Sequence, residues 1–132
     1  MAFLIDTDII IYSLKNNSIV NKNFLSYEKI PKSISVITYG ELIYGAQKSQ
    51  QKEKNLAIVR QIGTLFPILP VTKPIIETFG DLKAMLSKKG ISIDDMDLLI
   101  GATALAENLT VVTHNTKHFD KIPGLVIVDW SK

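Results

Sequence analysis

Short runs of β-branched and apolar residues alternate along the chain with longer segments that repeat apolar residues at helical spacing. The runs at residues 2–5, 33–37, 66–71, 110–113 and 125–130 predict five strands. The segments between them predict helices at residues 9–15, 16–30, 38–51, 55–66, 72–89 and 95–108. This alternation predicts an α/β fold, a three-layer α/β/α sandwich with a mainly parallel central sheet, built as a single domain from residues 1–132.

Polar residues near the helix ends suggest where the helices begin. Thr38 and Glu41 have the spacing of a capping box, and Ser92 and Asp95 repeat that spacing before the helix at residues 95–108. Gly90 favours the end of the helix at residues 72–89. We therefore expect the helix at residues 38–51 to begin at Thr38, directly after the second strand.

The composition fits one globular core. The chain has 132 residues, of which 46% are hydrophobic and 21% charged. It contains no cysteine, which excludes disulfides, thiolate metal sites and a cysteine nucleophile and fits a cytoplasmic location. Asp6 and Asp8 interrupt the apolar start where a signal peptide needs an uncharged stretch, and no apolar run reaches the roughly 18 residues that span a membrane. The net charge of +2 is weak evidence for a nucleic-acid partner.

Polar residues follow three of the predicted strands, and parallel α/β sheets place ligands beyond the carboxyl ends of their strands. The polar residues expected at this edge are Asp6, Thr7, Asp8, Glu41, Thr113, His114 and Asn115. Asp97 joins them if its helix begins at the same edge. Gathered carboxylates repel one another, and a hard divalent cation bound through oxygen relieves that repulsion. The pattern therefore predicts a site for Mg²⁺ or Mn²⁺.

Each acid also has a purely structural interpretation. Glu41 could complete a capping box, Asp6 and Asp8 could cap the helix after the first strand, and Asp97 could complement a helix dipole. These interpretations require several independent coincidences at one edge of the sheet. A cation site accounts for all of the acids together.

The same residues, taken with their neighbours, resemble a known family. The chain has Asp-Thr-Asp after its first strand, SVITYGELIYG at residues 35–45, DLLIGATA at 97–104, Thr-His-Asn at 113–115 and GLVIVDW at 124–130. Each motif alone is weak. Their order over essentially the whole chain resembles the PIN-domain nucleases, specifically the VapC-type toxins of bacterial toxin-antitoxin pairs.

The resemblance implies a PIN-like fold and a metal-dependent endoribonuclease that hydrolyses RNA phosphodiester bonds and leaves a 5′-phosphate. It implies tRNA as the substrate, since tRNA is the commonest target of similar toxins, and it implies a VapB-like antitoxin and a homodimer. Carried over by position, the catalytic residues and Mg²⁺ ligands would be Asp6, Glu41 and Asp97. The residues that orient or support them would be Thr7, Thr113 and Asn115.

One position departs from the family pattern, in which an acid follows as T-x-N-x-x-D-F. Here the stretch reads THNTKHF, so His118 stands in place of that acid. His118 could bind a second, softer metal, could donate a proton or contact a phosphate, or could be a surface residue without chemistry. Asp8 is a weaker metal-site candidate, because the family has asparagine or aspartate there. Lys15 and Lys117 are candidate contacts to the RNA backbone.

Two other classes of function compete with the nuclease. A receiver-like signalling domain also binds Mg²⁺ in a parallel α/β fold, but it needs an aspartate after the third strand, where this chain has Thr72 and Lys73. A catalytically inactive RNA-binding or interaction domain would not need three acids. For a partner, the apolar residues at 42–43 and 56–62 could form a dimer face or a groove for an antitoxin helix, although core packing also explains most of them.

Overall fold

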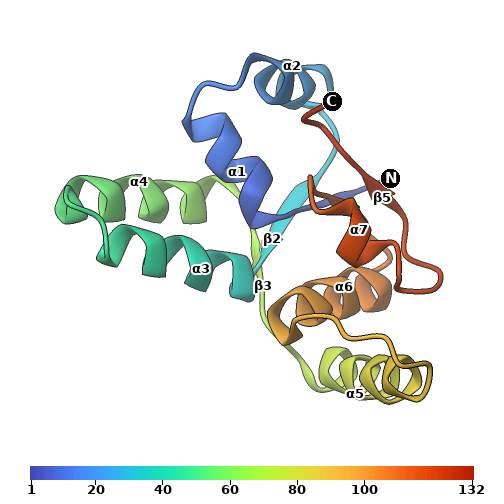
Figure 1. Ribbon diagram of the computed structural model, residues 1–132. Coiled ribbons are helices and arrows are strands. Elements are labelled where there is room, and N and C mark those ends of the chain that lie inside the picture. The colour runs from blue at the N-terminus through green and yellow to red at the C-terminus, as the bar shows by residue number, and fades with distance from the viewer.

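Five parallel strands form the centre of the molecule in the computed structural model, which describes residues 1–132 (Figure 1). The strands are β1 (Phe3–Ile5), β2 (Lys32–Ser35), β3 (Ile68–Leu69), β4 (Thr110–Val112) and β5 (Ile127–Val128). The helices are α1 (Thr7–Leu14), α2 (Ser18–Ser26), α3 (Val36–Gln47), α4 (Lys52–Leu65), α5 (Lys73–Lys88), α6 (Asp95–Glu107) and α7 (Thr116–Phe119). No helix is both long and apolar enough to cross a membrane.

The strands lie in the order β3-β2-β1-β4-β5, with β1 in the middle. Leu4 is paired with Ser33 of β2 on one side and with Val111 of β4 on the other. The chain first builds the sheet outward from β1 to β3 and then returns to add β4 and β5 on the opposite side. The strand order therefore reverses between β1 and β4, and parallel sheets bind ligands beyond the strand ends at such a point.

Successive residues of β1 face opposite sides of the sheet and belong to two separate cores. Phe3 and Ile5 pack with residues of α1, α2, α3 and α4, whereas Leu4 packs with residues of α5, α6 and α7. Figure 1 shows these two groups of helices on either side of the strands. The predicted three-layer sandwich is confirmed, and its central sheet is entirely parallel.

An aromatic cluster closes the side of the sheet that carries α2. Trp130 follows β5 and is only 2% exposed. Its ring packs edge-on against Phe3 at 5.1 Å and stacks on Tyr27 at 5.4 Å. The side chain of Asn23 donates a hydrogen bond of 2.9 Å to the Trp130 carbonyl oxygen. Residues after the last strand thus complete the core around the first strand.

Both predicted capping boxes are wrong. The N-cap of α3 is Ser35, whose Oγ accepts a hydrogen bond of 3.0 Å from the Ile37 backbone, so the helix begins before Thr38 and the strand ends earlier than predicted. The N-cap of α6 is Asp94, whose side chain accepts a hydrogen bond of 3.1 Å from the backbone N–H of Met96. In each case a Ser or Asp immediately before the first helical residue takes the role, because only the N-cap position directs its side chain at the free N–H groups.

Other boundaries shift by a few residues. β3 contains only residues 68–69 of the predicted 66–71, and α4 begins at Lys52 instead of residue 55. Prolines at both ends of the third strand remove backbone donors and keep it short. In α4 the apolar residues Leu56, Val59 and Ile62 are buried, but Leu65 is 69% exposed at the end of the helix.

Candidate active site

Asp6 lies at the carboxyl end of β1, beside the end of β4, and is 5% exposed. Its Oδ1 accepts a hydrogen bond of 2.9 Å from the backbone N–H of Thr7, which makes Asp6 the N-cap of α1. Its Oδ2 accepts a hydrogen bond of 2.8 Å from the hydroxyl of Thr113, the residue that follows β4. The carboxylate is therefore a helix cap and also part of the edge where the strand order reverses.

Glu41 reaches the same edge from α3. The hydroxyl of Thr7 donates a hydrogen bond of 2.6 Å to Glu41 Oε1, and Thr7 Oγ1 lies 3.2 Å from the hydroxyl of Thr38. Since α3 is capped by Ser35, the side chain of Glu41 is not used for capping. The family resemblance named Thr7 as a residue that supports the acids, whereas the alternative capping box of Thr38 and Glu41 would have turned Glu41 back to its own helix.

Asp97 lies in the first turn of α6 and contacts the segment that follows β4. Its Oδ2 is 3.1 Å from His118 Nδ1 and 3.5 Å from Asn115 Nδ2. The backbone N–H of Asn115 donates a hydrogen bond of 2.9 Å to Thr113 Oγ1, and the Thr113 hydroxyl in turn donates a hydrogen bond to Asp6. One short segment, residues 113–118, therefore connects Asp6 with Asp97.

The charge of Asp6 is poorly compensated by the protein. Burial raises the pKa of Asp6 to about 7, with further increases from the charges of Asp8 and Asp97, and the hydrogen bonds from Thr113 and Thr7 offset only part of that increase. Burial also raises the pKa of Asp8 above its ordinary value. The ion pairs of the chain are Lys83–Asp95, His114–Asp129 and His118–Asp97, so no lysine or arginine pairs with the buried acids.

The residues present suit a hard cation in their chemistry. Asp6, Glu41 and Asp97 supply carboxylate oxygens, the ligands that Mg²⁺ and Mn²⁺ prefer. Asp8 Oδ1 is buried without a hydrogen-bond partner. The acids are linked in pairs through hydroxyl and amide groups, however, and no three Asp, Glu or His side chains surround one point.

The remaining candidates lie around this edge. The backbone N–H of His114 donates a hydrogen bond of 3.1 Å to Asp8 Oδ2, while the His114 ring nitrogen Nδ1 lies 3.1 Å from Asp129 Oδ2. Lys117 is exposed on α7, and Lys15 is the exposed C-cap of α1.

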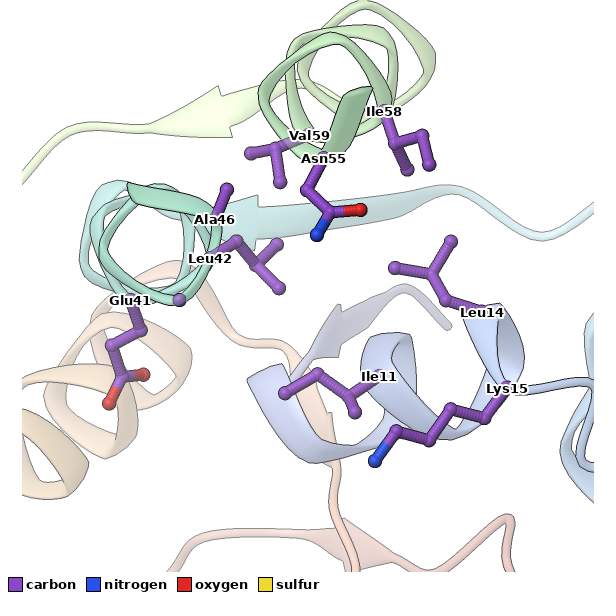
Figure 2. A pocket seen from close by; sticks show the side chains of 10 residues that line it. Ile11, Leu14, Lys15, Glu41, Leu42, Ala46, Asn55, Ile58 and Val59 are labelled. Carbon is purple, nitrogen blue, oxygen red and sulfur yellow. The ribbon is translucent and has the colours of Figure 1, made fainter. Parts of the chain in front are cut away.

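A groove of about 390 Å³ runs between α1, α3 and α4 and reaches Glu41 (Figure 2). Its apolar lining comes from Ile11, Leu14, Leu42, Ala46, Ile58 and Val59, and its polar lining includes Lys15, Glu41 and Asn55. Figure 2 shows α1 on one side of this groove and α3 with α4 on the other. Glu41 therefore belongs to both the acidic edge and the groove.

Comparison with known proteins identifies the family of the chain. The model of the PIN domain matches residues 3–125. The chain is a PIN-domain protein. Its relatives include the tRNA(fMet)-specific endonuclease VapC of Shigella flexneri, which is 32% identical over 99% of both chains. Another is ribonuclease VapC2 of Rickettsia felis, which is 34% identical over the full length of both.

A solved structure also resembles this PIN domain. The crystal structure of VapBC2 from Rickettsia felis, bound to a DNA fragment from its promoter, contains a chain that matches with a TM-score of 0.92 and 33% identity. The match covers 98% of this chain and 99% of that one. The PIN-domain chain therefore belongs to the VapC group, as its motifs predict. Membership of this group excludes the alternative that the chain is a receiver-like signalling domain.

Proposed function

We propose that this VapC-type chain is a metal-dependent endoribonuclease, the toxin component of a toxin-antitoxin pair. The observation that carries the proposal is the buried carboxylate of Asp6, whose charge no basic side chain neutralises and whose pKa the neighbouring acids Asp8 and Asp97 raise further. Such a group costs the folded protein stability at neutral pH, and a bound cation offsets that cost. Relatives named as ribonucleases support RNA as the substrate.

Asp6, Glu41 and Asp97 would hold Mg²⁺, with Mn²⁺ as an alternative. When bound, the cation would neutralise charge on a phosphodiester and activate a water molecule, so no protein nucleophile is required. The hydroxyls of Thr113 and Thr7 hold the carboxylates of Asp6 and Glu41 in fixed orientations. We expect the products to carry a 5′-phosphate, as the family resemblance implies.

For the RNA, we propose tRNA, and initiator tRNA first, because the name of the Shigella flexneri relative specifies tRNA(fMet). Lys15 lines the groove beside Glu41, and Lys117 is exposed on α7 next to His118. Lys15 is thus near Glu41, and Lys117 is next in the chain to the residue that contacts Asp97. Contacts from both to phosphates would hold the RNA backbone across the site.

A cleavage assay tests this function. The purified chain is incubated with initiator tRNA, elongator methionine tRNA and an mRNA, in Mg²⁺, in Mn²⁺ or in EDTA. We expect cleavage of tRNA with either cation, none in EDTA, and a rate lower by more than roughly 100-fold for Asp97→Asn, because that change removes a charged ligand. The termini of the fragments are mapped to identify the 5′-phosphate.

Asp95→Asn is the matched control for Asp97→Asn. Asp95 lies in the same helical turn but forms an exposed ion pair with Lys83 at 2.9 Å, so its loss should change little. Cleavage that persists in EDTA or in Asp97→Asn would exclude metal-dependent catalysis by these acids. Binding of RNA without cleavage under every condition would favour the inactive RNA-binding alternative.

The groove between α1, α3 and α4 suits the antitoxin. We propose that a helical segment of a VapB-like antitoxin lies in it, with apolar side chains against Ile11 and Ile58 and a basic side chain near Glu41. Because Glu41 also lies at the acidic edge, an occupant of the groove would cover part of the site. The relative of known structure is itself a VapBC complex.

Substitution in the groove tests the antitoxin proposal. Ile58→Arg introduces a charge into the apolar lining and should weaken binding of the co-expressed antitoxin by about tenfold or more, measured by calorimetry. Ile76→Arg is the control, because Ile76 is 45% exposed on α5, in the opposite layer. Equal affinity of the two variants would place the antitoxin elsewhere.

A further inference from the structure

His118 contacts the acidic edge from α7, although its side chain is 48% exposed. Its Nδ1 lies 3.1 Å from Asp97 Oδ2 and 2.8 Å from Asn115 Nδ2. The other oxygen of Asp97, Oδ1, has no hydrogen-bond donor in the protein. One oxygen of this carboxylate is thus held by neighbouring residues while the other is free.

The proton on His118 decides what this contact does. A neutral imidazole carries its proton on one ring nitrogen only, so Nδ1 either donates or accepts. An unprotonated Nδ1 would set its lone pair against the anionic Oδ2 of Asp97, whereas an Nδ1–H group makes a charge-assisted hydrogen bond with it. The amide nitrogen of Asn115 faces Nδ1 at 2.8 Å, so an Nδ1–H group requires this amide to turn its oxygen toward the ring and to give up the 3.5 Å contact from Nδ2 to Asp97 Oδ2. The negative charge of Asp97 outweighs the loss of that long contact and favours the tautomer protonated at Nδ1.

We propose that His118 is a positioning residue, which donates from Nδ1 to Asp97 Oδ2 and so directs the free Oδ1 to the cation of the proposed nuclease site. This role rests on the proposed function, since it gives Asp97 a fixed orientation as a ligand. A group that donates a hydrogen bond to a metal ligand in this way orients the ligand and raises its affinity for the metal. Residues 113–118 then set the positions of two acids, Asp6 through Thr113 and Asp97 through His118.

The tautomer of His118 can be measured without metal or RNA. Long-range ¹H–¹⁵N spectra are recorded in EDTA above about pH 8, where an ordinary imidazole is neutral. The chain has two histidines, and His114→Asn assigns their signals. We expect His118 to be protonated at Nδ1 and to change to the Nε2–H form in Asp97→Ala, but not in Asp95→Ala. An Nε2–H tautomer in the unmodified protein would overturn the proposal.

Calorimetry with Mg²⁺ and with Mn²⁺ tests the effect on the cation. We expect His118→Ala to lower the affinity for both cations by a similar factor, about 10- to 100-fold. His118→Asn should restore most of the affinity, because its amide N–H can donate in place of Nδ1. Circular dichroism confirms that each variant is folded.

Two other results would contradict the positioning role. A loss confined to Mn²⁺ that His118→Asn does not restore would mean that His118 binds the metal directly, since imidazole suits Mn²⁺ better than Mg²⁺. Unchanged affinities in His118→Ala would mean that the residue is structural. A wild-type protein that fails to cleave RNA would refute the proposed function alone, because the tautomer and the cation affinities are measured without RNA.

Discussion

At the scale of single residues, Asp6 combines two roles that oppose each other. As the N-cap of α1 it stabilises the helix, a contribution typically of about 1 kcal/mol. As an acid buried near Asp8 and Asp97, it has a pKa raised to about 7 by burial and by their charges. Its ionisation at neutral pH therefore destabilises the folded chain in the absence of a cation.

The stability of the metal-free chain should fall as the pH rises. The raised pKa lets the folded protein retain the Asp6 proton until about pH 7, whereas an unfolded chain releases it near the ordinary aspartate pKa of 3.8. Between these values the folded state holds more protons, so the free energy of unfolding decreases with pH, by a few kcal/mol in total. Urea unfolding in EDTA at pH 5, 6, 7 and 8 measures this decrease.

Asp6→Asn should flatten that pH dependence, because an amide does not ionise. At pH 8 we expect Asp6→Asn to be more stable than the unmodified chain in EDTA and less stable than it in Mn²⁺. Asp95→Asn, on the exposed first turn of α6, should keep the original slope. A stability that rises from pH 5 to pH 8 would contradict the cost assigned to ionised Asp6.

Some residue contacts could be predicted from the sequence, and others depended on packing. Thr113 and Asp6 follow strands that were both expected in one parallel sheet, so their proximity was predictable. The contact between His118 and Asp97 was not, because it joins two helices whose relative position no local pattern specifies. The sequence identified His118 as unusual but left its role open.

At the scale of elements, the close approach of α6 to the segment after α7 positions Asp97. Gly101, one turn after Asp97, faces Ile122, and a Cβ at Gly101 would lie 2.5 Å from Ile122 Cδ1. Ile122 is buried in the core formed with residues of α5, α6 and α7. The missing side chain therefore sets how closely the helix that carries Asp97 approaches residues 119–125.

Gly101→Ala should destabilise the chain by about 1 to 3 kcal/mol through overpacking, despite the gain in helix propensity. Gly80→Ala in α5 is the control, because nothing lies within 4 Å of its added Cβ, and it should stabilise by roughly 0.5 to 1 kcal/mol. Thermal unfolding measures both. Ile122→Val removes the clashing methyl and should partly rescue Gly101→Ala; a stabilised Gly101→Ala would contradict this packing.

The element boundaries show why local signals are incomplete. The type and order of the main helices and strands followed from periodicity, which tertiary packing preserved. Capping signals were ambiguous, because Ser35 and Thr38 both lie near the junction of β2 and α3. The strand pairing of β2, which ends at Ser35, selects Ser35 as the cap. A capping-box match could not reveal that Glu41 turns toward Thr7 instead.

At the scale of the whole molecule, an apolar surface lies next to the acidic edge. Val36, Tyr44 and Met96 are 39%, 65% and 47% exposed, and they border a hollow that Glu41 also lines. Leu42, Leu56, Val59 and Ile62, which the sequence offered as a dimer or groove face, are largely buried, so most of that set is core. We therefore place the expected homodimer contact at the Tyr44 surface.

Light scattering on a size-exclusion column tests this contact. We expect the unmodified chain to be a dimer and Tyr44→Asp to be a monomer, since the charge replaces the most exposed of the three apolar side chains of this surface. Leu25→Asp is the control, because Leu25 is 69% exposed on α2, away from this surface. A monomeric wild type, or a dimeric Tyr44→Asp, would contradict the assignment.

The packing of Trp130 against Phe3 has a consequence for the timing of synthesis. All the acids at residues 6, 41 and 97 leave the ribosome before Trp130 covers the first strand. Contacts between such distant positions form late in folding. A chain that ends before Ile127 would therefore have its acids but lack β5, whose Val128 carbonyl oxygen accepts a hydrogen bond of 2.9 Å from the backbone N–H of Thr113. We expect such a truncated chain to be inactive, because it lacks the strand that holds Thr113 against Asp6.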